Sequence, residues 1–239
     1  MKKILSPLAI TASLIVGPAA SANHFDFLSD AGFSISADET DASPTMNTST
    51  GAGGNIIGEE REVTLWADLG AFNAVLDVPA GPGPVGPNTA VILNVSPTGP
   101  DAAFSFGTLR LAYNGQGSTG LGGLDFDTMW DSLDVSFASI TGGQLDLRLS
   151  VSDTNGNTGM AALGALGSPG SYSFSFTDSG FVNAGVDFTS VDSVIFDFET
   201  IDPGVAFGIS GITREAIPEP SSTLLIGLSI VGFVSRRRR

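Results

Sequence analysis

The sequence predicts an all-β protein, built as a two-sheet β-sandwich or a barrel, between an N-terminal signal helix and a short C-terminal transmembrane helix. Three observations lead to this fold class. Short runs that alternate apolar and polar residues recur from Glu60 to Ile212. Glycine, proline and asparagine separate these runs, and the sequence between the two ends shows no 3.6-residue apolar period. About nine short strands of this kind predict a sandwich or a barrel rather than a helical fold.

The first 22 residues have the three parts of a secretory signal peptide. A basic start, Met1-Lys2-Lys3, precedes an apolar stretch from Ile4 to Gly17. Ala20 and Ala22 then provide the small side chains that a signal peptidase recognises, so we expect cleavage between Ala22 and Asn23. This leader predicts export of the chain.

The composition of the body, residues 23–217, excludes several classes of protein. The body has four arginines, no lysine and 24 acidic residues, which is a formal charge of −20. This charge repels the phosphates of nucleic acids and attracts cations such as calcium. The chain has no cysteine, so the core alone has to hold the fold, and about 195 residues suffice for one domain.

The alternating runs predict the strands in order. The clearest run is 145–151, where every second residue is apolar. Asn155-Gly156 predicts a tight hairpin turn shortly after it. Residues 38–54 are small, polar and aperiodic and predict a loop, and residues 160–166 are expected to form one helical turn at most. The predicted strands are 60–69, 72–78, 91–95, 103–113, 133–137, 145–151, 172–176, 194–198 and 205–212.

The last 22 residues carry an ordered set of features. Two prolines bracket a glutamate and keep this tripeptide extended, outside any following helix. The uncharged run 221–234 follows and, as a helix, spans about 21 Å, which is short for a hydrocarbon core of about 30 Å. A terminal cationic cluster stays on the cytoplasmic side of a membrane, so the body lies outside. These features are Pro218, Glu219, Pro220, the apolar run, and then Arg236, Arg237, Arg238 and Arg239.

This tail resembles a PEP-CTERM sorting signal. The resemblance lies in Pro218-Glu219-Pro220-Ser221-Ser222-Thr223-Leu224-Leu225, the short apolar run and the terminal arginines. It implies recognition by an exosortase, cleavage near the tripeptide, and delivery to the surface or extracellular matrix of a Gram-negative bacterium. Some ice-binding proteins carry the same tail, which is sometimes named the ice-binding protein C-terminal domain.

The body resembles jelly-roll, galactose-binding-like modules. The resemblance lies in residues 134–151, where two alternating strands lead to a turn, and in residues 186–212, which end in a glycine-spaced strand. It implies a two-sheet β-sandwich of jelly-roll type, and another sandwich topology would also fit the strand pattern. We expect three segments: a signal peptide at 1–22, an extracellular β-sandwich domain at 23–217 and the sorting signal at 218–239.

Two groups of residues are candidates for ligand binding. Asp153, Asn155 and Asn157 place oxygen donors at alternate positions of one turn, as calcium prefers. The run lacks the distal glutamate of an EF-hand loop, and a hairpin turn uses the same residue types, so a solvated turn is the alternative. Trp66 and Trp130 are the two tryptophans and could stack on a sugar, with burial in the core as the alternative.

The sequence predicts no catalytic residues. His24 is the only histidine and lies two residues from the predicted cleavage site, which argues against a serine hydrolase triad and against histidine-rich metal sites. Paired carboxylates could still hydrolyse a glycosidic bond. Most of the acids alternate with apolar strand residues, as on a solvated sheet face. The candidates for such a pair are Glu199, Asp197, Asp125, Asp127 and Asp131.

We therefore expect a non-catalytic structural, adhesive or glycan-binding component of the cell surface or the extracellular polysaccharide matrix. Its expected partners are the signal peptidase and an exosortase during export, the membrane transiently through the C-terminal helix, and polysaccharide. The alternative is a secreted carbohydrate-active hydrolase that uses paired carboxylates. Ice binding would need flat ranks of threonines at strand spacing, and the run 47–50 is too short and irregular to form one.

Overall fold

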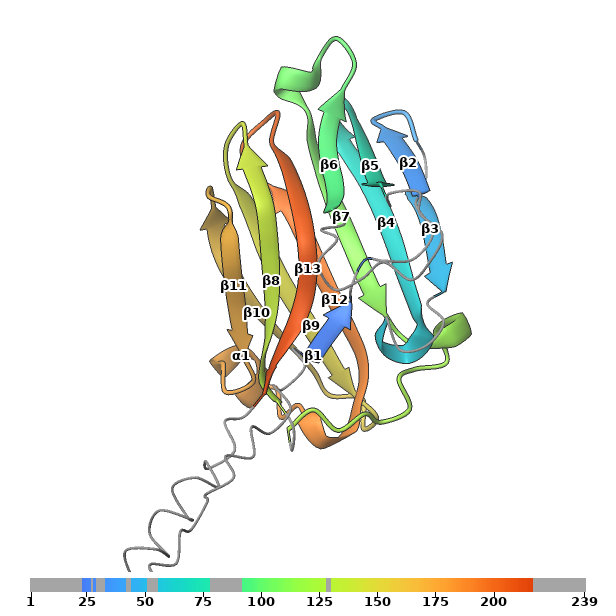
Figure 1. Cartoon of the computed structure of the whole chain (residues 1–239), viewed down its shortest axis with the longest axis vertical. Helices are drawn as coiled ribbons and strands as arrows, with labels where there is room; N and C mark the ends of the chain where they lie inside the picture. Colours follow the sequence, from blue (N-terminus) through green and yellow to red (C-terminus); the bar gives the residue numbers. More distant parts are fainter. Residues whose placement is uncertain are drawn as a thin grey trace, which may run out of the picture.

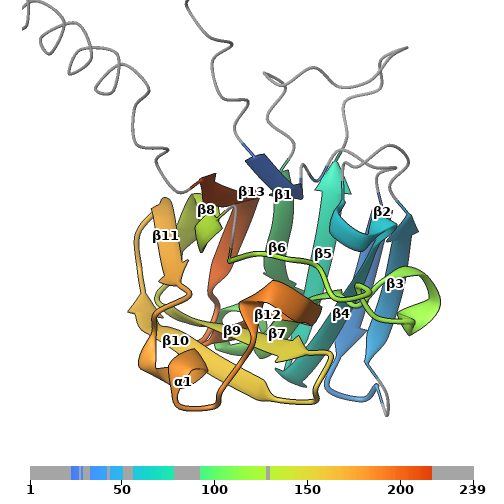
Figure 2. The same cartoon turned by 90° about the horizontal axis from the view of Figure 1, so that it is seen from below.

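The computed structural model describes residues 23–26, 28, 33–41, 44–50, 56–77, 92–127 and 130–216, which form two antiparallel β-sheets packed face to face. The larger sheet has the strand order β11-β8-β13-β6-β5-β2, and β1 pairs with β13. The smaller sheet has the order β10-β9-β12-β7-β4-β3. Figure 1 shows the whole chain, and Figure 2 shows the two layers from one end. The predicted all-β, two-sheet sandwich is confirmed.

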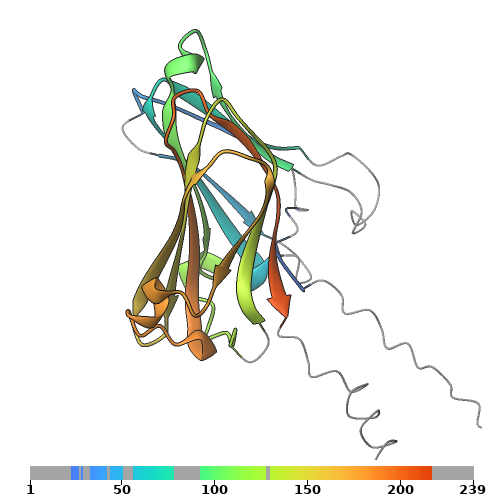
Figure 3. The same cartoon turned by 90° about the vertical axis from the view of Figure 1, so that its left-hand side faces the viewer.

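Consecutive strands often lie in opposite sheets, as β6 and β7, β8 and β9, and β12 and β13 do. This crossing connectivity is that of a jelly roll. Figure 3 shows the layers from the side of β10 and β11. The strands are β1 (Asn23–Asp26), β2 (Phe33–Asp38), β3 (Thr45–Thr50), β4 (Glu60–Leu69), β5 (Ala71–Asp77), β6 (Ile92–Thr98), β7 (Phe106–Tyr113), β8 (Trp130–Thr141), β9 (Leu145–Asp153), β10 (Thr158–Leu166), β11 (Gly170–Ser175), β12 (Val191–Thr200) and β13 (Ala206–Ala216).

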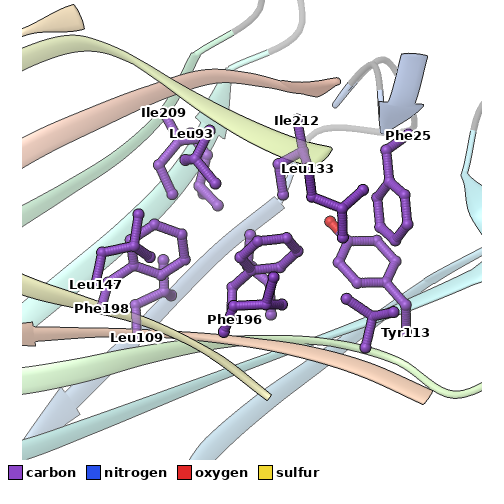
Figure 4. Close-up of a cluster of buried hydrophobic side chains, with 14 of the residues drawn as sticks. Phe25, Leu93, Leu109, Tyr113, Leu133, Leu147, Phe196, Phe198, Ile209 and Ile212 are labelled. Atoms are coloured by element: carbon purple, nitrogen blue, oxygen red, sulfur yellow. The ribbon is translucent and has the colours of Figure 1, made fainter. Parts of the chain in front are cut away.

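The core fills the space between the two sheets, and the two-residue alternation explains it. In β9, Leu145, Leu147, Leu149 and Val151 are fully buried, and the residues between them are partly exposed. Aromatic rings from both layers meet in the same space, as Figure 4 shows. Each fully buried apolar side chain of this size contributes about 1.5–3 kcal/mol relative to exposure. The alternating apolar residues therefore provide the main driving force for the sandwich.

Two predictions about local structure are wrong. Residues 38–54 were expected to form a loop or a loose N-terminal arm, but 45–50 form β3, an edge strand paired with β4. Residues 160–166 were expected to form a helical turn at most, but they belong to β10, whose register shifts between Ala162 and Ala165. The described α-helix is instead α1 (Ser179–Val182), where the Asp178 side chain accepts a hydrogen bond from the Gly180 N–H.

The start of the first described strand lies beside the end of the last one. β1 runs antiparallel to β13, with Asn23 opposite Arg214, so the start of β1 lies beside the end of β13 (Figures 1 and 3). The predicted signal helix and C-terminal transmembrane helix lie outside the described residues. Within the described ranges, no helix is long and apolar enough to cross a membrane.

Candidate binding site

The exposed face of the smaller sheet gathers the cations that the body presents to solvent. Of its four arginines, Arg61 is fully buried in the core and Arg214 is partly buried against Trp130. Arg110 and Arg148 are each 41% exposed and lie on β7 and β9. Their residues alternate with inward-facing leucines on both strands, which places both guanidinium groups on the outer face.

Three carboxylates on the same face hold these arginines. Arg110 donates from Nε to Asp197 Oδ1 at 2.7 Å and from Nη2 to Asp197 Oδ2 at 3.2 Å. Arg148 donates from Nε to Asp146 Oδ2 at 2.7 Å, and its Nη2 lies 2.9 Å from Glu199 Oε2. We call these five side chains, Arg110, Asp146, Arg148, Asp197 and Glu199, the charged ladder.

The charged ladder contributes little to folding. The arginine ends of these pairs are 41% exposed, and ion pairs at a protein surface are worth about 0–1 kcal/mol each. Burial acts to lower the pKa of Arg148, but the hydrogen bond and charge of Asp146 and the charges of Glu199 and Asp197 outweigh it and raise that pKa above its ordinary value. The guanidinium group therefore stays charged, and the ladder alternates charged donors and acceptors.

Trp66 lies beside the ladder. It is partly exposed on β4, and the guanidinium carbon of Arg110 lies 5.1 Å from the centroid of its ring. This is a cation–π contact between neighbouring strands. The aromatic ring and the stacked guanidinium group form one amphipathic surface next to the carboxylates. Trp66 is thus the predicted ligand-binding tryptophan that the structure places on an exposed face.

Trp130 has different surroundings. Only 7% of its surface is exposed, and its ring packs edge-on against Phe126 in the core, at 5.3 Å between centroids. The Arg214 guanidinium lies 3.9 Å from the Trp130 ring centroid, and burial lowers the pKa of Arg214. Trp130 is therefore a buried residue, which is the alternative to stacking on a sugar.

Asp153 organises the turn that the sequence suggests for calcium. Its Oδ1 accepts hydrogen bonds from the backbone N–H groups of Asn155 and Asn157, both at 2.9 Å. Its Oδ2 accepts from the Asn157 side-chain amide at 2.8 Å and from the Asp187 N–H at 3.0 Å. Burial acts to raise the pKa of Asp153, but these hydrogen bonds outweigh it and hold the pKa below its ordinary value.

The turn is therefore one in which N–H groups surround a carboxylate. Asn157 presents its amide nitrogen, not its oxygen, to Asp153. Within the described ranges, no three His, Cys, Asp or Glu side chains are grouped to hold a metal ion. Calcium binding by Asp153, Asn155 and Asn157 stays a prediction.

The five candidate catalytic carboxylates fall into two places. Asp197 and Glu199 lie two residues apart on the outer face of β12 and belong to the charged ladder. Asp125 and Asp127 lie in the segment between β7 and β8, and Asp131 lies near the start of β8. The structure thus brings together one pair, and both of its members bind arginine.

Arg110 and Asp146 are site residues that sequence reasoning did not select. Alternation along β7 and β9 shows that both side chains leave the core. The sequence does not show that β12 lies between these two strands, which is what joins Arg110, Asp197 and Arg148. Such a row of side chains can be recognised only once the strand order is known.

The protein is a two-sheet β-sandwich whose smaller sheet carries paired charged residues on its outer face. Comparison with known proteins identifies a sorting motif after its last strand. Residues 216–239 match the model of the PEP-CTERM protein-sorting motif. This match confirms the sorting-signal resemblance, and the motif implies exosortase-sorted export to the cell surface. A comparison with curated proteins gives no match.

Several solved structures are similar to the chain at low identity. The family 11 carbohydrate-binding module of Lic26A-Cel5E from Clostridium thermocellum is 11% identical, with a TM-score of 0.36, over 83% of this chain and 96% of that one. An exo-β-agarase is 12% identical, with a TM-score of 0.41, over 83% of this chain and 25% of that one. PfGH50B is 12% identical, with a TM-score of 0.39, and the match covers 61% of this chain and 22% of that one. A shared ligand or activity does not follow from such values.

Proposed function

We propose that this chain is an exported protein that an exosortase sorts to the cell surface or extracellular polysaccharide matrix, where its sandwich acts as a non-catalytic, glycan-binding component. The observation that carries the proposal is the sorting motif, which begins at residue 216, where β13 ends. The leader is removed between Ala22 and Asn23. The apolar run 221–234 holds a membrane-tethered intermediate until the tail is processed near Glu219.

Glycan binding is proposed because of the groups on the outer face of the smaller sheet. A glycan presents hydroxyl groups and apolar C–H faces, and it needs hydrogen-bonding side chains beside an accessible aromatic ring. Trp66, stacked with Arg110, provides the ring, and the charged ladder provides donors and acceptors.

We propose that this face is not catalytic because its two candidate carboxylates are paired with arginines. A glycosidase needs one carboxyl group to donate a proton and another to act as base or nucleophile. The Asp197 oxygens both accept hydrogen bonds from Arg110, and Glu199 pairs with Arg148. Arginine thus holds both oxygens of Asp197 and approaches one oxygen of Glu199. This arrangement supports a binding role for the face.

Sorting is tested by changing the tail in the full-length chain in the native host. We expect Glu219→Ala, and separately a deletion of Arg236–Arg239, to leave the protein in the membrane fraction. Asp68→Ala, which removes an exposed acid of the body, should leave delivery unchanged and is the control. Normal surface delivery of both tail variants would overturn the sorting part of the proposal.

Binding and turnover are tested together on the full-length chain in detergent. We expect retention by immobilised polysaccharide without release of reducing ends, and weaker retention after Trp66→Ala. Release of reducing ends that is lost on Glu199→Gln would instead establish the hydrolase alternative.

A further inference from the structure

Three members of the charged ladder, Arg110, Asp197 and Arg148, form one straight row across three adjacent strands. In the sheet register, Asp197 of β12 lies opposite Arg110 of β7 on one side and opposite Arg148 of β9 on the other. Strands are about 4.8 Å apart, so the two arginine backbones are separated by about 9.6 Å. A second row, two residues along each strand, contains Trp66, Thr108, Glu199 and Asp146. An extended ligand that crosses the strands can therefore contact both rows at once.

The ladder keeps hydrogen-bonding capacity that the protein does not use. Both arginines bind their carboxylates through Nε and Nη2, and within the described ranges neither Nη1 group makes a hydrogen bond. Asp146 Oδ1 is shielded from solvent and has no hydrogen-bond partner in the part of the chain that the structure describes. A ligand hydroxyl does not reach this shielded oxygen. Glu199, whose side chain is 46% exposed, approaches Arg148 through Oε2 only. The charged ladder thus offers unused guanidinium donors beside an exposed carboxylate.

The balance of charge on the charged ladder favours one kind of ligand. Two arginines face three carboxylates, so the ladder carries a small negative charge within a body of formal charge −20. A uronic acid or sulfated glycan would meet repulsion from this field. A neutral glycan brings no charge, and each hydroxyl can donate to a carboxylate or accept from a guanidinium group. The ring of Trp66 adds a surface for an apolar sugar face.

We propose that the charged ladder and Trp66 bind a neutral glycan chain that lies across β4, β7, β12 and β9. This inference rests on the proposed function, because it names the ligand of the same glycan-binding face. The free Nη1 groups of Arg110 and Arg148 donate to hydroxyl oxygens, and the exposed carboxylate of Glu199 accepts from a hydroxyl group. Because no net charge is neutralised, binding is insensitive to salt.

The test is affinity electrophoresis of the full-length chain in detergent, with neutral polysaccharides (hydroxyethylcellulose, galactomannan and dextran) and anionic ones (alginate and hyaluronan). We expect retardation by at least one neutral polysaccharide, unchanged from low to high salt. Arg148→Gln and Asp197→Asn should each weaken that binding about tenfold, the equivalent of one charge-assisted hydrogen bond of about 1.4 kcal/mol. Asp134→Asn is the matched control, because it changes the same charge on the outer face of the larger sheet.

The outcomes separate the inference from the proposed function. Salt-sensitive binding to alginate or hyaluronan alone overturns the neutral ligand and keeps a glycan-binding protein. Neutral binding that survives both ladder variants overturns the assignment to this face and again keeps glycan binding. No retention by any polysaccharide, with an unchanged circular dichroism spectrum, overturns both.

Discussion

Arg61 and Asp26 form a buried ion pair that joins the two layers of the sandwich. Arg61 Nη1 on β4 of the smaller sheet lies 2.6 Å from Asp26 Oδ2 on β1 of the larger sheet, and both side chains are fully buried. The Tyr113 hydroxyl donates to the same Oδ2 at 2.7 Å, and the Leu28 N–H donates to Oδ1 at 2.7 Å. Strand β1 is thus fastened to the opposite sheet through one carboxylate.

Removing that carboxylate should destabilise the domain strongly. We expect Asp26→Ala to lower the free energy of unfolding by about 3–5 kcal/mol, because it removes a carboxylate that is paired with a buried guanidinium group. Urea unfolding of residues 23–217, followed by circular dichroism, measures the loss. The double variant Asp26→Leu/Arg61→Met should recover much of the stability, because it removes both buried charges.

Asp41→Ala is the control for this pair, since Asp41 is exposed and its loss should change the free energy of unfolding little. A double variant no more stable than Asp26→Ala would show that the charges themselves are needed.

The Asp153 turn should make stability depend on pH. In the folded state the pKa of Asp153 lies below its ordinary value, whereas in the unfolded chain it is about 3.9. The folded state therefore binds fewer protons in this window, so the stabilisation is complete above about pH 4–5 and is lost as the pH falls. We expect Asp153→Asn to lower stability at neutral pH and to flatten the fall below pH 4, measured by thermal unfolding across a pH series.

Asp127→Asn, which changes an exposed acid, is the comparison for Asp153→Asn. The same pH profile in Asp153→Asn and the unchanged chain would refute this role of the carboxylate.

Gly107 on β7 packs closely against the backbone of β4 and against Phe72 of β5. A Cβ atom on Gly107 would lie 2.5 Å from the Trp66 carbonyl oxygen and 2.9 Å from Phe72 Cδ2. We expect Gly107→Ala to cost about 1–3 kcal/mol, because backbone and core would have to move. Gly211→Ala is a matched control in β13, where the nearest atom would be Asp26 O at 4.0 Å. Equal urea midpoints for the two variants would contradict the close approach.

The two tryptophans should differ in their contribution to stability and in their accessibility to a quencher in solution. We expect Trp130→Ala to cost about 3–5 kcal/mol, because it leaves a cavity in the core, and Trp66→Ala to cost much less. In Trp130→Phe the remaining Trp66 should be quenched readily by acrylamide, and in Trp66→Phe the remaining Trp130 should be protected. Equal quenching would place both rings in the same environment.

Local sequence patterns predict some elements well and others poorly. The run 145–151 was predicted as a half-buried strand, and β9 has its leucines inside as expected. The prediction failed at β3 and β10, which are both edge strands. β3 contains mainly threonine, serine and asparagine, and β10 is rich in alanine and glycine. Such strands lack apolar alternation because pairing with one neighbour, and not burial of a full face, holds them in the sheet.

The inward or outward direction of side chains in strands with clear alternation, such as β9, and the tail motif can be read along the chain. Each depends on residues that lie next to one another. The pairing of Arg61 with Asp26, and the row of Arg110, Asp197 and Arg148, were decided by the tertiary structure. Arg110 and Asp197 are 87 positions apart, and they meet because β7 and β12 are neighbours in one sheet. Strand order depends on how all the apolar faces pack together, and no local pattern contains that information.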